Sequence, residues 1–499
     1  MTSSADVLRI DSNDNVAIAL GRIEAGESLH FDQKRIVAKE PIPQGHKVAL
    51  TSIEAGDQVI KYGHAIGSAN KPIQPGQWMH THNMQSALQE TQDYIYQPSP
   101  KPAFGTNRTF SFDGFLRQDG KAGIRNEIWI IPTVGCINSI AEMLAARANA
   151  ELKGGNIDGV YHFAHPYGCS QLGGDLKATQ QLLAALVHHP NAGGVLVIGL
   201  GCENNQINDF KTIIGPYDET RVKFYNLQDV EDEIEQGMAM LKQLVSHAAV
   251  ARRQPLPVSK LVLGLKCGGS DAFSGITANP LLGEISDGII AEGGSAVLTE
   301  VPEMFGAETI LMNRAKDEAT FHKIVRLIND FKDYFLRHSQ PIYENPSPGN
   351  KQGGITTLEE KSLGCIRKGG RSPVMDVFAY GRQISGHGLM LLNGPGNDMV
   401  STTALAAAGA QLVLFTTGRG TPFGGPVPTI KIASNSAMAV KKKIWIDFDA
   451  GRLLSGETME TLVEEFFEKI LRIASGKLRT KNERFNARQI AIFKDGVTL

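Results

Sequence analysis

The stretch EIWIIPTVGCIN (127–138) places an apolar run directly before a glycine and a cysteine, an order that predicts a buried strand with a loop at its carboxyl end. Three more apolar runs end in the same way: 160–168 before Cys169, 195–201 before Cys202, and 261–266 before Cys267. Segments of helical period separate these runs, and this alternation is typical of a parallel α/β sheet. Because the carboxyl ends of parallel strands open onto one edge, we expect the cysteine-bearing loops to converge there and to carry the chemistry.

Length and composition limit the class of protein. A chain of 499 residues exceeds one ordinary core, so two or three domains are expected. The net charge of -2 provides no basic field for nucleic acid. Every apolar run is shorter than the roughly 20 residues needed to span a bilayer, so no membrane partner is expected. Five widely spaced cysteines and an amino terminus without signal-peptide features indicate a cytoplasmic protein.

The pattern along the chain predicts three domains. Residues 1–96 contain short β-rich runs at 16–20, 35–38, 47–50 and 58–62 and lack a helical period, which indicates a small barrel-like or clip-like β domain. Residues 97–109 are rich in proline and polar residues and are predicted to be a linker. A first α/β domain is expected over 110–255 and a second over 256–499, with the boundary in RQPLPVSK (253–260) and a basic surface tail after a last helix at 458–475.

The same patterns predict individual elements of the two α/β domains. Strands are expected at 127–134, 159–164, 194–200, 222–226, 261–265, 296–300, 388–392 and 412–416. Helices are expected at 139–152, 172–188, 229–251, 277–292 and 314–338.

Six glycine-rich loops follow predicted strands and favour a ligand crevice. They are GCIN (135–138), HPYGCSQ (165–171), GCEN (201–204), KCGGSD (266–271), NGPGND (393–398) and TGRGTPFGGP (417–426). Glycine lets the backbone approach a ligand, and free N–H groups at helix starts bind anions. Tight turns with buried cysteines are the alternative for any one loop, but the recurrence at six loops favours a crevice. The chain contains neither a Walker A motif nor GxGxxG after the first strand, so no nucleotide cofactor is expected.

The stretch HTHN (80–83) is a candidate metal site. On a strand, His80 and His82 would share one face, so both imidazoles could bind one iron, manganese or zinc ion. Solvated histidines at a polar strand end are the alternative. Lys61 and Tyr62, in the same domain, offer a cation and a phenol for proton transfer.

Charged residues near predicted strands are further candidates. The loop LRQDGKAGIRNE (116–127) offers Arg117, Lys121 and Arg125 to a substrate carboxylate, or is a solvated basic loop. Four carboxylates at or near strand ends are candidate metal ligands or bases: Glu203, Asp271, Glu300 and Glu303.

Taken together, these stretches resemble the altronate dehydratase/galactarate dehydratase family of sugar-acid hydro-lyases over nearly the whole chain. The resemblance is carried, in order, by PIPQGHKVAL (41–50), IKYGHAIG (60–67), HTHN, residues 112–138, HPYGCSQ, GLGCEN (199–204), LKCGGSD (265–271), TEVPE (299–303) and TGRGTPFGGPVPTIKI (417–432). Length and the compact amino-terminal module look more like the altronate branch. The resemblance implies a multidomain α/β protein, in which a SAF-like β-clip domain precedes Rossmann-like parallel α/β domains.

The resemblance also implies a reaction and a cofactor. D-Altronate would lose water to give 2-dehydro-3-deoxy-D-gluconate, with Fe2+ or alternatively Mn2+ and no nucleotide, in hexuronate catabolism. A homodimer or other homo-oligomer is expected. Open alternatives are a galactarate, hydroxy-acid or sulfo-acid lyase, an iron–sulfur dehydratase with Cys136, Cys169 and Cys202 or Cys267 around a cluster, and a non-catalytic sugar-acid-binding protein.

Roles within this set of residues are predicted as follows. The candidate catalytic residues are Lys61, Tyr62, Lys121, Arg125, Cys267 and Asp271. The candidate substrate-binding residues are Asn83, Cys136, Cys169, Glu203, Asn204, Gly268, Arg419 and Gly420. The candidate metal ligands are His80, His82 and Glu300.

Overall fold

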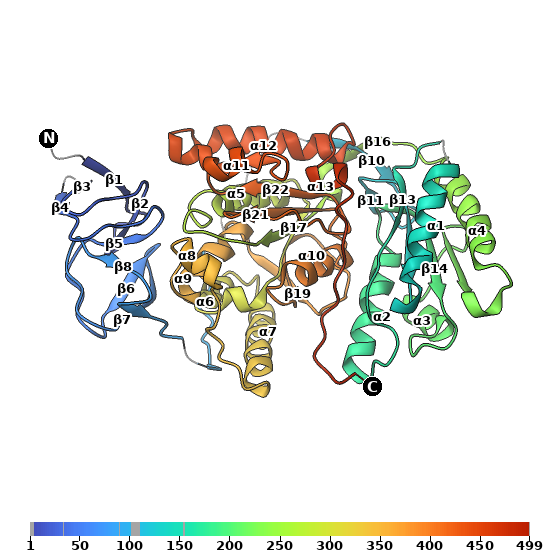
Figure 1. Ribbon diagram of the computed structural model, residues 1–499, viewed down its shortest axis with the longest axis horizontal. Helices are drawn as coiled ribbons and strands as arrows, with labels where there is room; N and C mark the ends of the chain where they lie inside the picture. The colour runs from blue at the N-terminus through green and yellow to red at the C-terminus, as the bar shows by residue number, and fades with distance from the viewer. Residues whose placement is uncertain (1–3, 33, 89, 101–109, 153–154, 499) are drawn as a thin grey trace.

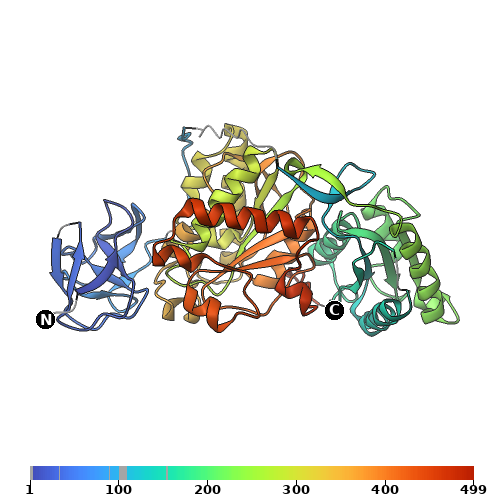
Figure 2. The same cartoon turned by 90° about the horizontal axis from the view of Figure 1, so that it is seen from above.

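The computed structural model describes residues 4–32, 34–88, 90–100, 110–152 and 155–498. Three units are arranged in a row, and their order in space differs from their order in the chain. The carboxy-terminal α/β unit lies in the middle, with the amino-terminal β domain on one side and the first α/β unit on the other (Figures 1 and 2). The middle unit therefore contacts both others.

The β domain contains two small sheets. The larger has the order β4-β3-β1-β2-β5-β8 and the smaller the order β6-β7-β9. Their strands are β1 (Ser4–Leu8), β2 (Val16–Ala19), β3 (Ser28–Phe31), β4 (Lys34–Val37), β5 (Lys47–Ala49), β6 (Gln58–Lys61), β7 (His64–Ala69), β8 (Trp78–Met79) and β9 (Met84–Gln85). The four strands predicted in this domain are confirmed.

The expected strand through HTHN is wrong, because residues 80–83 form the turn between β8 and β9. The Asn83 side-chain oxygen accepts a hydrogen bond from the His80 backbone N–H at 2.9 Å, and the Asn83 amide nitrogen donates to the Trp78 carbonyl at 2.8 Å. An asparagine side chain that bonds to the backbone of nearby residues in this way favours a turn over a strand. The two imidazoles consequently do not share a strand face.

The first α/β unit contains a parallel sheet of order β13-β12-β14-β15. Its strands are β12 (Glu127–Pro132), β13 (Gly159–His162), β14 (Ala192–Gly199) and β15 (Val222–Asn226), and its helices are α1 (Asn138–Glu151), α2 (Gly173–Val187), α3 (Ile207–Ile214) and α4 (Glu233–Ala248). All eight residues of β14 are buried, as expected for a strand covered by helices on both faces. The four predicted strands are confirmed, whereas α3 was not predicted.

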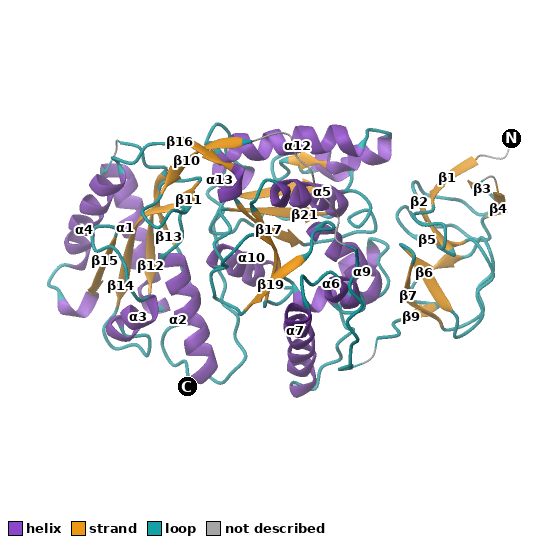
Figure 3. Cartoon of the chain, turned by 180° about the vertical axis from the view of Figure 1, so that it is seen from behind, coloured by secondary structure: helices purple, strands orange, loops and turns teal. Residues whose placement is uncertain are grey.

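The middle unit contains a seven-stranded parallel sheet of order β19-β20-β18-β17-β21-β22-β23. Its strands are β17 (Val262–Cys267), β18 (Ser295–Leu298), β19 (Val374–Phe378), β20 (Gly388–Leu392), β21 (Leu412–Thr417), β22 (Thr429–Ala433) and β23 (Phe448–Asp449). Helices surround this sheet (Figure 3): α5 (Ala278–Ala291), α6 (Glu308–Asn313), α7 (Glu318–Arg337), α8 (Pro348–Gln352), α9 (Leu358–Cys365), α10 (Asp398–Ala407), α11 (Ser436–Lys441), α12 (Met459–Ala474) and α13 (Lys481–Arg484). The predicted strands and the helices predicted at 277–292, 314–338 and 458–475 are present, with ends shifted by a few residues.

Two segments join the units more closely than the sequence indicated. Residues 254–257 form β16 (Gln254–Pro257), which pairs with β10 (Ser111–Leu116), and β10 also pairs with β11 (Ala122–Gly123). The predicted linker falls partly on residues 101–109, which lie outside the described residues. Before them, Tyr96 donates a hydrogen bond to the Ala315 carbonyl in the middle unit at 2.8 Å.

The carboxy-terminal tail was expected on the surface, but it packs between the two α/β units. It descends beside α2 (Figure 1), Ile490 and Ile492 are buried, and Thr498 forms a β-bridge with Gln171. The basic character of the tail is misleading because Arg488 is neutralised by Glu127 of the first α/β unit at 2.7 Å. The tail thus ties the two units together.

Candidate active site at the edge of the seven-stranded sheet

A cavity of about 790 Å³ opens at the carboxyl edge of the seven-stranded sheet. Loops that follow four strands line it, and they carry Cys267, Glu303, Asp398 and Thr421. The convergence predicted from the sequence is therefore confirmed for the loops after β17, β20 and β21. The expectation of one shared edge is wrong, because the loops with Cys136, Cys169 and Cys202 belong to the separate sheet of the first α/β unit and do not line this cavity. Gln489 and Phe493 of the carboxy-terminal tail close part of the wall.

The first polar group of this site surrounds Glu300, which lies two residues after the end of β18. Lys368 donates to the Glu300 carboxylate at 2.6 Å and contacts the Cys267 sulfur at 2.8 Å, and Lys266 also pairs with Glu300. Each of these four residues is about 1% exposed or less. Glu300 has a left-handed backbone with φ of 69°, and such strain in a non-glycine residue is concentrated at functional sites.

The second polar group lies beside the first and contains Glu303, Lys361 and two cysteines. Lys361 donates to Glu303 at 2.9 Å, and the Cys267 and Cys365 sulfurs lie 3.4 and 3.2 Å from the Glu303 carboxylate. Burial alone would raise the pKa of Glu303, but the ammonium charges of Lys361, Lys266 and Lys368 lower it to about 2. A hydrogen bond with Cys267, together with burial, raises the pKa of Cys365 well above its ordinary value. Glu303 is accordingly a carboxylate and Cys365 a thiol at neutral pH.

Sequence reasoning missed Lys266, Lys361, Cys365 and Lys368 as site residues. Lys361 and Cys365 lie on α9, and Lys368 follows that helix, in a region for which no element was predicted. No sequence signal marks them, because α9 (LEEKSLGC) is half polar, and only the structure shows that all eight of its residues are buried, Glu359, Glu360 and Lys361 included. Burial of that many charges requires partners, and these partners lie on the sheet edge and in the β domain.

One group of donor atoms in this site could bind a metal ion. The ligand atoms of Cys267, Glu303 and Cys365 lie within 4.8 Å of one another, and all three residues are buried. Within the described ranges no other set of three histidine, cysteine or acidic side chains is as close. The three predicted metal ligands His80, His82 and Glu300 do not form such a set.

The β domain contributes Lys47 and Lys61 to a buried contact with Glu360 of α9. Their ammonium nitrogens lie 2.7 and 2.8 Å from the two Glu360 oxygens. Burial alone would raise the pKa of Glu360, but these two charges lower it to about 2. Tyr62 lies beside this contact, and the Arg367 guanidinium stacks 4.8 Å from its ring. Lys61 and Tyr62 thus lie near Asp271 and Cys365, around a small second pocket.

His80 is half-buried in the β domain and faces the segment that precedes α9. Its Nδ1 lies 2.9 Å from the Thr356 hydroxyl, and its ring contacts His46 at 4.9 Å between centroids. Burial, with the nearby Lys47 charge, lowers the pKa of His80 to about 4, so its imidazole is neutral at pH 7. His82 is exposed and leans on the Trp78 ring at 4.9 Å.

Asp271, Gly268, Arg419 and Gly420 belong to the loops of the sheet edge. Asp271 accepts hydrogen bonds from the Ser434 hydroxyl at 2.7 Å and the Asn435 amide at 2.9 Å, which anchor its loop. A side chain at position 268 would collide with Asp398 and Phe415, so a glycine is required where β17 ends. Arg419 is exposed and donates to Gln352 at 3.0 Å. Gly420 has a φ of +84°.

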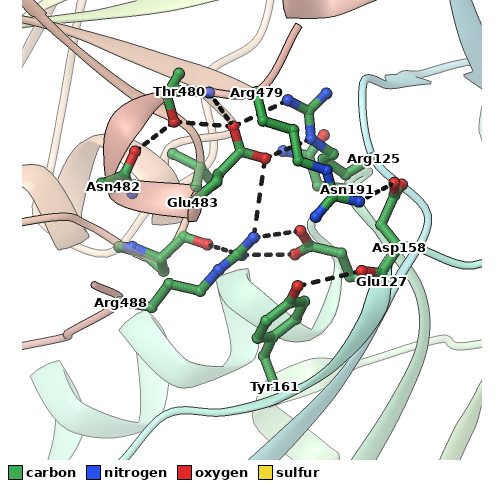
Figure 4. A network of polar contacts seen from close by, with 12 residues as sticks. Arg125, Glu127, Asp158, Tyr161, Asn191, Arg479, Thr480, Asn482, Glu483 and Arg488 are labelled. Atoms are coloured by element: carbon green, nitrogen blue, oxygen red, sulfur yellow. Dashed lines mark hydrogen bonds and ion pairs between the residues drawn. The ribbon is translucent and has the colours of Figure 1, made fainter. Parts of the chain in front are cut away.

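The structure does not bring Lys121 or Arg125 to the cavity. Both precede β12, which belongs to the separate sheet of the first α/β unit, and neither lines the cavity. Arg125 forms a bidentate pair with Glu483 at 2.7 and 3.0 Å, inside a buried network that also contains Glu127 and Arg488 (Figure 4). Lys121 is exposed and contacts Gln383 at 2.7 Å and Asp119 at 3.3 Å. The buried network around Arg125 and Glu483 binds the tail to the first α/β unit.

This geometry predicts a structural effect of the Arg125→Met substitution. Removal of the guanidinium leaves Glu483 buried with an incomplete set of partners, which should lower the free energy of unfolding by about 3–5 kcal/mol. Urea unfolding of both proteins measures the change. The KM of the protein that remains folded should be unchanged, and a KM increase at full stability would instead support the predicted contact between Arg125 and substrate.

The remaining candidates lie at the carboxyl edge of the first α/β unit. Cys136, Cys169 and Asn204 are exposed there. Glu203 is buried, and its carboxylate accepts hydrogen bonds from the backbone N–H groups of Leu200 and Gly201 at 3.0 and 2.7 Å. Glu203 therefore stabilises the conformation of its own loop.

The cavity contains groups that suit a small anionic molecule rich in oxygen. The cavity wall offers the Lys361 ammonium as well as amide groups of Asn345, Asn350 and Asn397. Comparison with known proteins identifies the class. Residues 5–87 match the "Altronate/galactarate dehydratase SAF domain", 114–249 the "D-galactarate dehydratase/Altronate hydrolase, second domain", and 258–498 the "D-galactarate/Altronate dehydratase, C-terminal" family model.

Relatives of similar length match over nearly the whole chain. An altronate dehydratase of Bacillus subtilis (strain 168) is 53% identical, with 99% of both chains covered. An altronate dehydratase of Escherichia coli (strain K12) is 52% identical, also with 99% of both covered. A galactarate dehydratase (L-threo-forming) of Escherichia coli (strain K12) is 33% identical, with 99% of this chain and 97% of the relative covered.

The chain is a carbon–oxygen hydro-lyase of the sugar-acid dehydratase class. It belongs to the altronate/galactarate dehydratase family and is more similar to the two altronate dehydratases than to the galactarate dehydratase. Among the helices of the described residues, none has the length and apolar character needed to cross a membrane.

Proposed function

We propose that this chain dehydrates D-altronate to 2-dehydro-3-deoxy-D-gluconate in the cavity at the edge of the seven-stranded sheet. The observation that carries the proposal is the arrangement of Glu303, Lys361, Cys267 and Asp398 around one cavity, in a chain more than half identical to altronate dehydratases. The carboxyl edge would thus serve the same purpose as in Rossmann-like sheets, where ligands bind beyond the strand ends.

The chemical difficulty is the weak acidity of the C2 proton, which lies next to a carboxylate. Loss of this proton places additional negative charge on the carboxylate, and fixed positive charge is the strongest source of stabilisation. Burial alone would lower the pKa of Lys361, but the Glu303 carboxylate raises it, so Lys361 is an ammonium ion in the cavity wall. We assign Lys361 to the substrate carboxylate and the nearby asparagine amides to its hydroxyl groups.

A base and an acid are also required. Asp398 lines the cavity at the start of α10, is 37% exposed, and lies 3.0 Å from the Lys266 ammonium, so it is an accessible carboxylate held in place. We assign Asp398 to removal of the C2 proton. Asp398 can serve as both base and acid, because the proton it takes from C2 can be given to the C3 hydroxyl, which then leaves as water.

The residues of the sheet edge fit a divalent metal ion. Cys267, Glu303 and Cys365 would hold it, and thiolate ligands favour Fe2+ over Mn2+. When bound, such an ion supplies Lewis-acid stabilisation to the substrate carboxylate and a hydroxyl. Cys365 must lose its proton to become a ligand, so the affinity for metal should fall as pH falls.

His80 and His82 remain the alternative holders of the metal, and substitution distinguishes the two locations. Cys365→Ser should weaken Fe2+ binding, measured by anaerobic equilibrium dialysis, by more than the roughly 10–100-fold typical of second-shell changes. The His80→Ala, His82→Ala double variant should keep wild-type affinity. The opposite pattern would place the metal in the β domain.

A substrate panel tests the proposed function. Anaerobic protein reconstituted with Fe2+ should form a 2-keto-3-deoxy product from D-altronate, and more slowly from other hexonates and from hexarates. The product is scored chemically as a 2-keto-3-deoxy acid. Turnover of galactarate alone would identify the other branch of the family, and binding of sugar acids without any turnover would refute the lyase assignment.

A further inference from the structure

Three exposed cysteines line the carboxyl edge of the first α/β unit, away from the proposed active site. Cys136 follows β12, Cys169 follows β13 and Cys202 follows β14, and each comes directly after a glycine. Strand β12 pairs with both β13 and β14, so the three cysteines belong to three adjacent strand ends. The proposed dehydration uses none of them.

The three cysteine-bearing loops interlock into one surface. The Gly135 N–H donates to the Tyr167 carbonyl at 2.8 Å, and the Asn205 N–H donates to the Gly168 carbonyl at 3.0 Å. A Cβ atom at position 168, where φ is +101°, would lie 2.0 Å from the Thr133 carbonyl oxygen, so only glycine permits this approach. Neighbouring strands are about 4.8 Å apart, so the ends of these three strands lie within roughly 5–10 Å of one another, and the interlocked loops hold the three cysteines at the same edge.

This spacing does not suit a single metal ion. With metal–sulfur bonds of about 2.3 Å, three thiolates around one tetrahedral ion lie roughly 4 Å from one another. In the part of the chain that the structure describes, the group closer than 4.8 Å is Cys267, Glu303 and Cys365, not this trio. Wider separation suits an iron–sulfur cluster, in which each cysteine binds a different iron.

Neighbouring groups also fit a cluster. The Gln228 amide nitrogen lies 3.6 Å from the Cys202 sulfur as a donor. The Gln171 amide nitrogen, in the Cys169 loop, is buried and has no partner among the described residues, and N–H donors to sulfur tune such centres. The nearest acidic residue in sequence, Glu203, is occupied by the Thr133 hydroxyl and backbone N–H groups, so it does not compete as a ligand.

We propose that Cys136, Cys169 and Cys202 hold a [4Fe–4S] cluster with one iron that has no protein ligand. Each cysteine binds as a thiolate after loss of its proton, and the iron is supplied as ferrous and ferric ions in equal number together with sulfide, so the [4Fe–4S]2+ state forms without a further oxidant. The open iron would accept an oxygen ligand, such as the carboxylate of a hydroxy acid. This centre is distinct from the metal site of the proposed dehydration and does not depend on it.

Anaerobic reconstitution of the full chain with equal amounts of ferrous and ferric ion and with sulfide tests the proposal. The wild-type chain should gain about four acid-labile sulfides and a broad visible absorbance from a [4Fe–4S] cluster. Each of Cys136→Ser, Cys169→Ser and Cys202→Ser should lose both signals while the far-UV circular dichroism is unchanged, because all three sites are exposed. The matched control Cys365→Ser should keep them.

Several outcomes would overturn the proposal. The first is wild-type protein that gains no labile sulfide or that binds zinc only. The second is a cluster that survives when all three cysteines are replaced by serine. The third is loss of the cluster in Cys365→Ser alone. A colourless chain that dehydrates altronate with ferrous ion would refute the cluster and leave the proposed function intact. A chain that holds the cluster but lacks dehydratase activity would refute the proposed function and leave the cluster proposal intact.

Discussion

Glu360→Gln should lower the free energy of unfolding by about 3–5 kcal/mol, because it leaves the Lys47 and Lys61 ammonium groups buried without a counter-charge. Both lysines are about 1% exposed or less, and Glu360 is the carboxylate that both contact. Because Lys47 and Lys61 belong to the β domain and Glu360 to α9, the loss should loosen the contact between the two units. Urea unfolding gives the free energy, and hydrogen exchange in β7 and α9 reports the contact.

The acid sensitivity of this contact has a defined sign. The pKa of Glu360 is lowered from 4.5 to about 2 in the folded chain. Its contribution to stability is therefore complete above pH 4.5 and is lost as pH falls toward 2. Between these values the wild-type chain should lose more stability than Glu360→Gln does.

A matched control separates buried from exposed charge. Glu465 pairs with Arg452 at 2.7 Å, but both side chains are substantially exposed. Glu465→Gln should change the free energy of unfolding by no more than about 1 kcal/mol. Equal effects of the two substitutions would show that the Glu360 contact is not the buried triad described above.

Lys361→Met should lower kcat/KM for altronate by about 10²–10³-fold, the cost of removing one group that stabilises developing negative charge. The ammonium of Lys361 lines the cavity and lies 2.9 Å from Glu303, so its loss removes positive charge at the proposed position of the substrate carboxylate. Steady-state kinetics with saturating Fe2+ measures the effect, and thermal unfolding establishes that the variant is folded. Lys361→Arg should restore part of the activity because it keeps the charge.

Lys351→Met is the control for this prediction. Lys351 belongs to the adjacent helix α8, is half-buried, and does not line the cavity. Its substitution should leave kcat/KM within a factor of about two of the wild-type value. If Lys361→Met retained wild-type kcat/KM, the assignment of Lys361 to the substrate carboxylate would be withdrawn.

Local patterns in the sequence predicted the sheets well, because each strand carries its own evidence. The run 127–134 and the run 412–416 are apolar and are bounded by turn residues, and both proved to be central strands. Period-2 and helical patterns arise from burial of one segment against another, so they can be recognised without knowledge of the partner. The HTHN stretch was misassigned because a side-chain hydrogen bond, rather than periodicity, decides its conformation.

The candidate site was predictable only in part, for a related reason. Cys267 and Gly268 could be found because they lie at the end of a strand, and Glu303 because it lies near the end of the next one. Lys361, Cys365 and Lys368 reach the same site from α9 and the segment after it, where no strand end indicates them. Arg125 resembled a substrate ligand in sequence, yet it pairs with Glu483, 358 residues away, in a buried network that does not line the cavity.

The amino-acid sequence by itself determined the parallel sheets, the strand ends that carry the glycine-rich loops and the family to which the chain belongs. Tertiary structure alone decided which charges meet. Lys47 and Lys61 meet Glu360, Lys361 meets Glu303, and the basic tail enters the space between two units. The physical reason is that apolar periodicity is a property of one segment. The free energy of a buried charge, in contrast, depends on a partner that only the folded chain supplies.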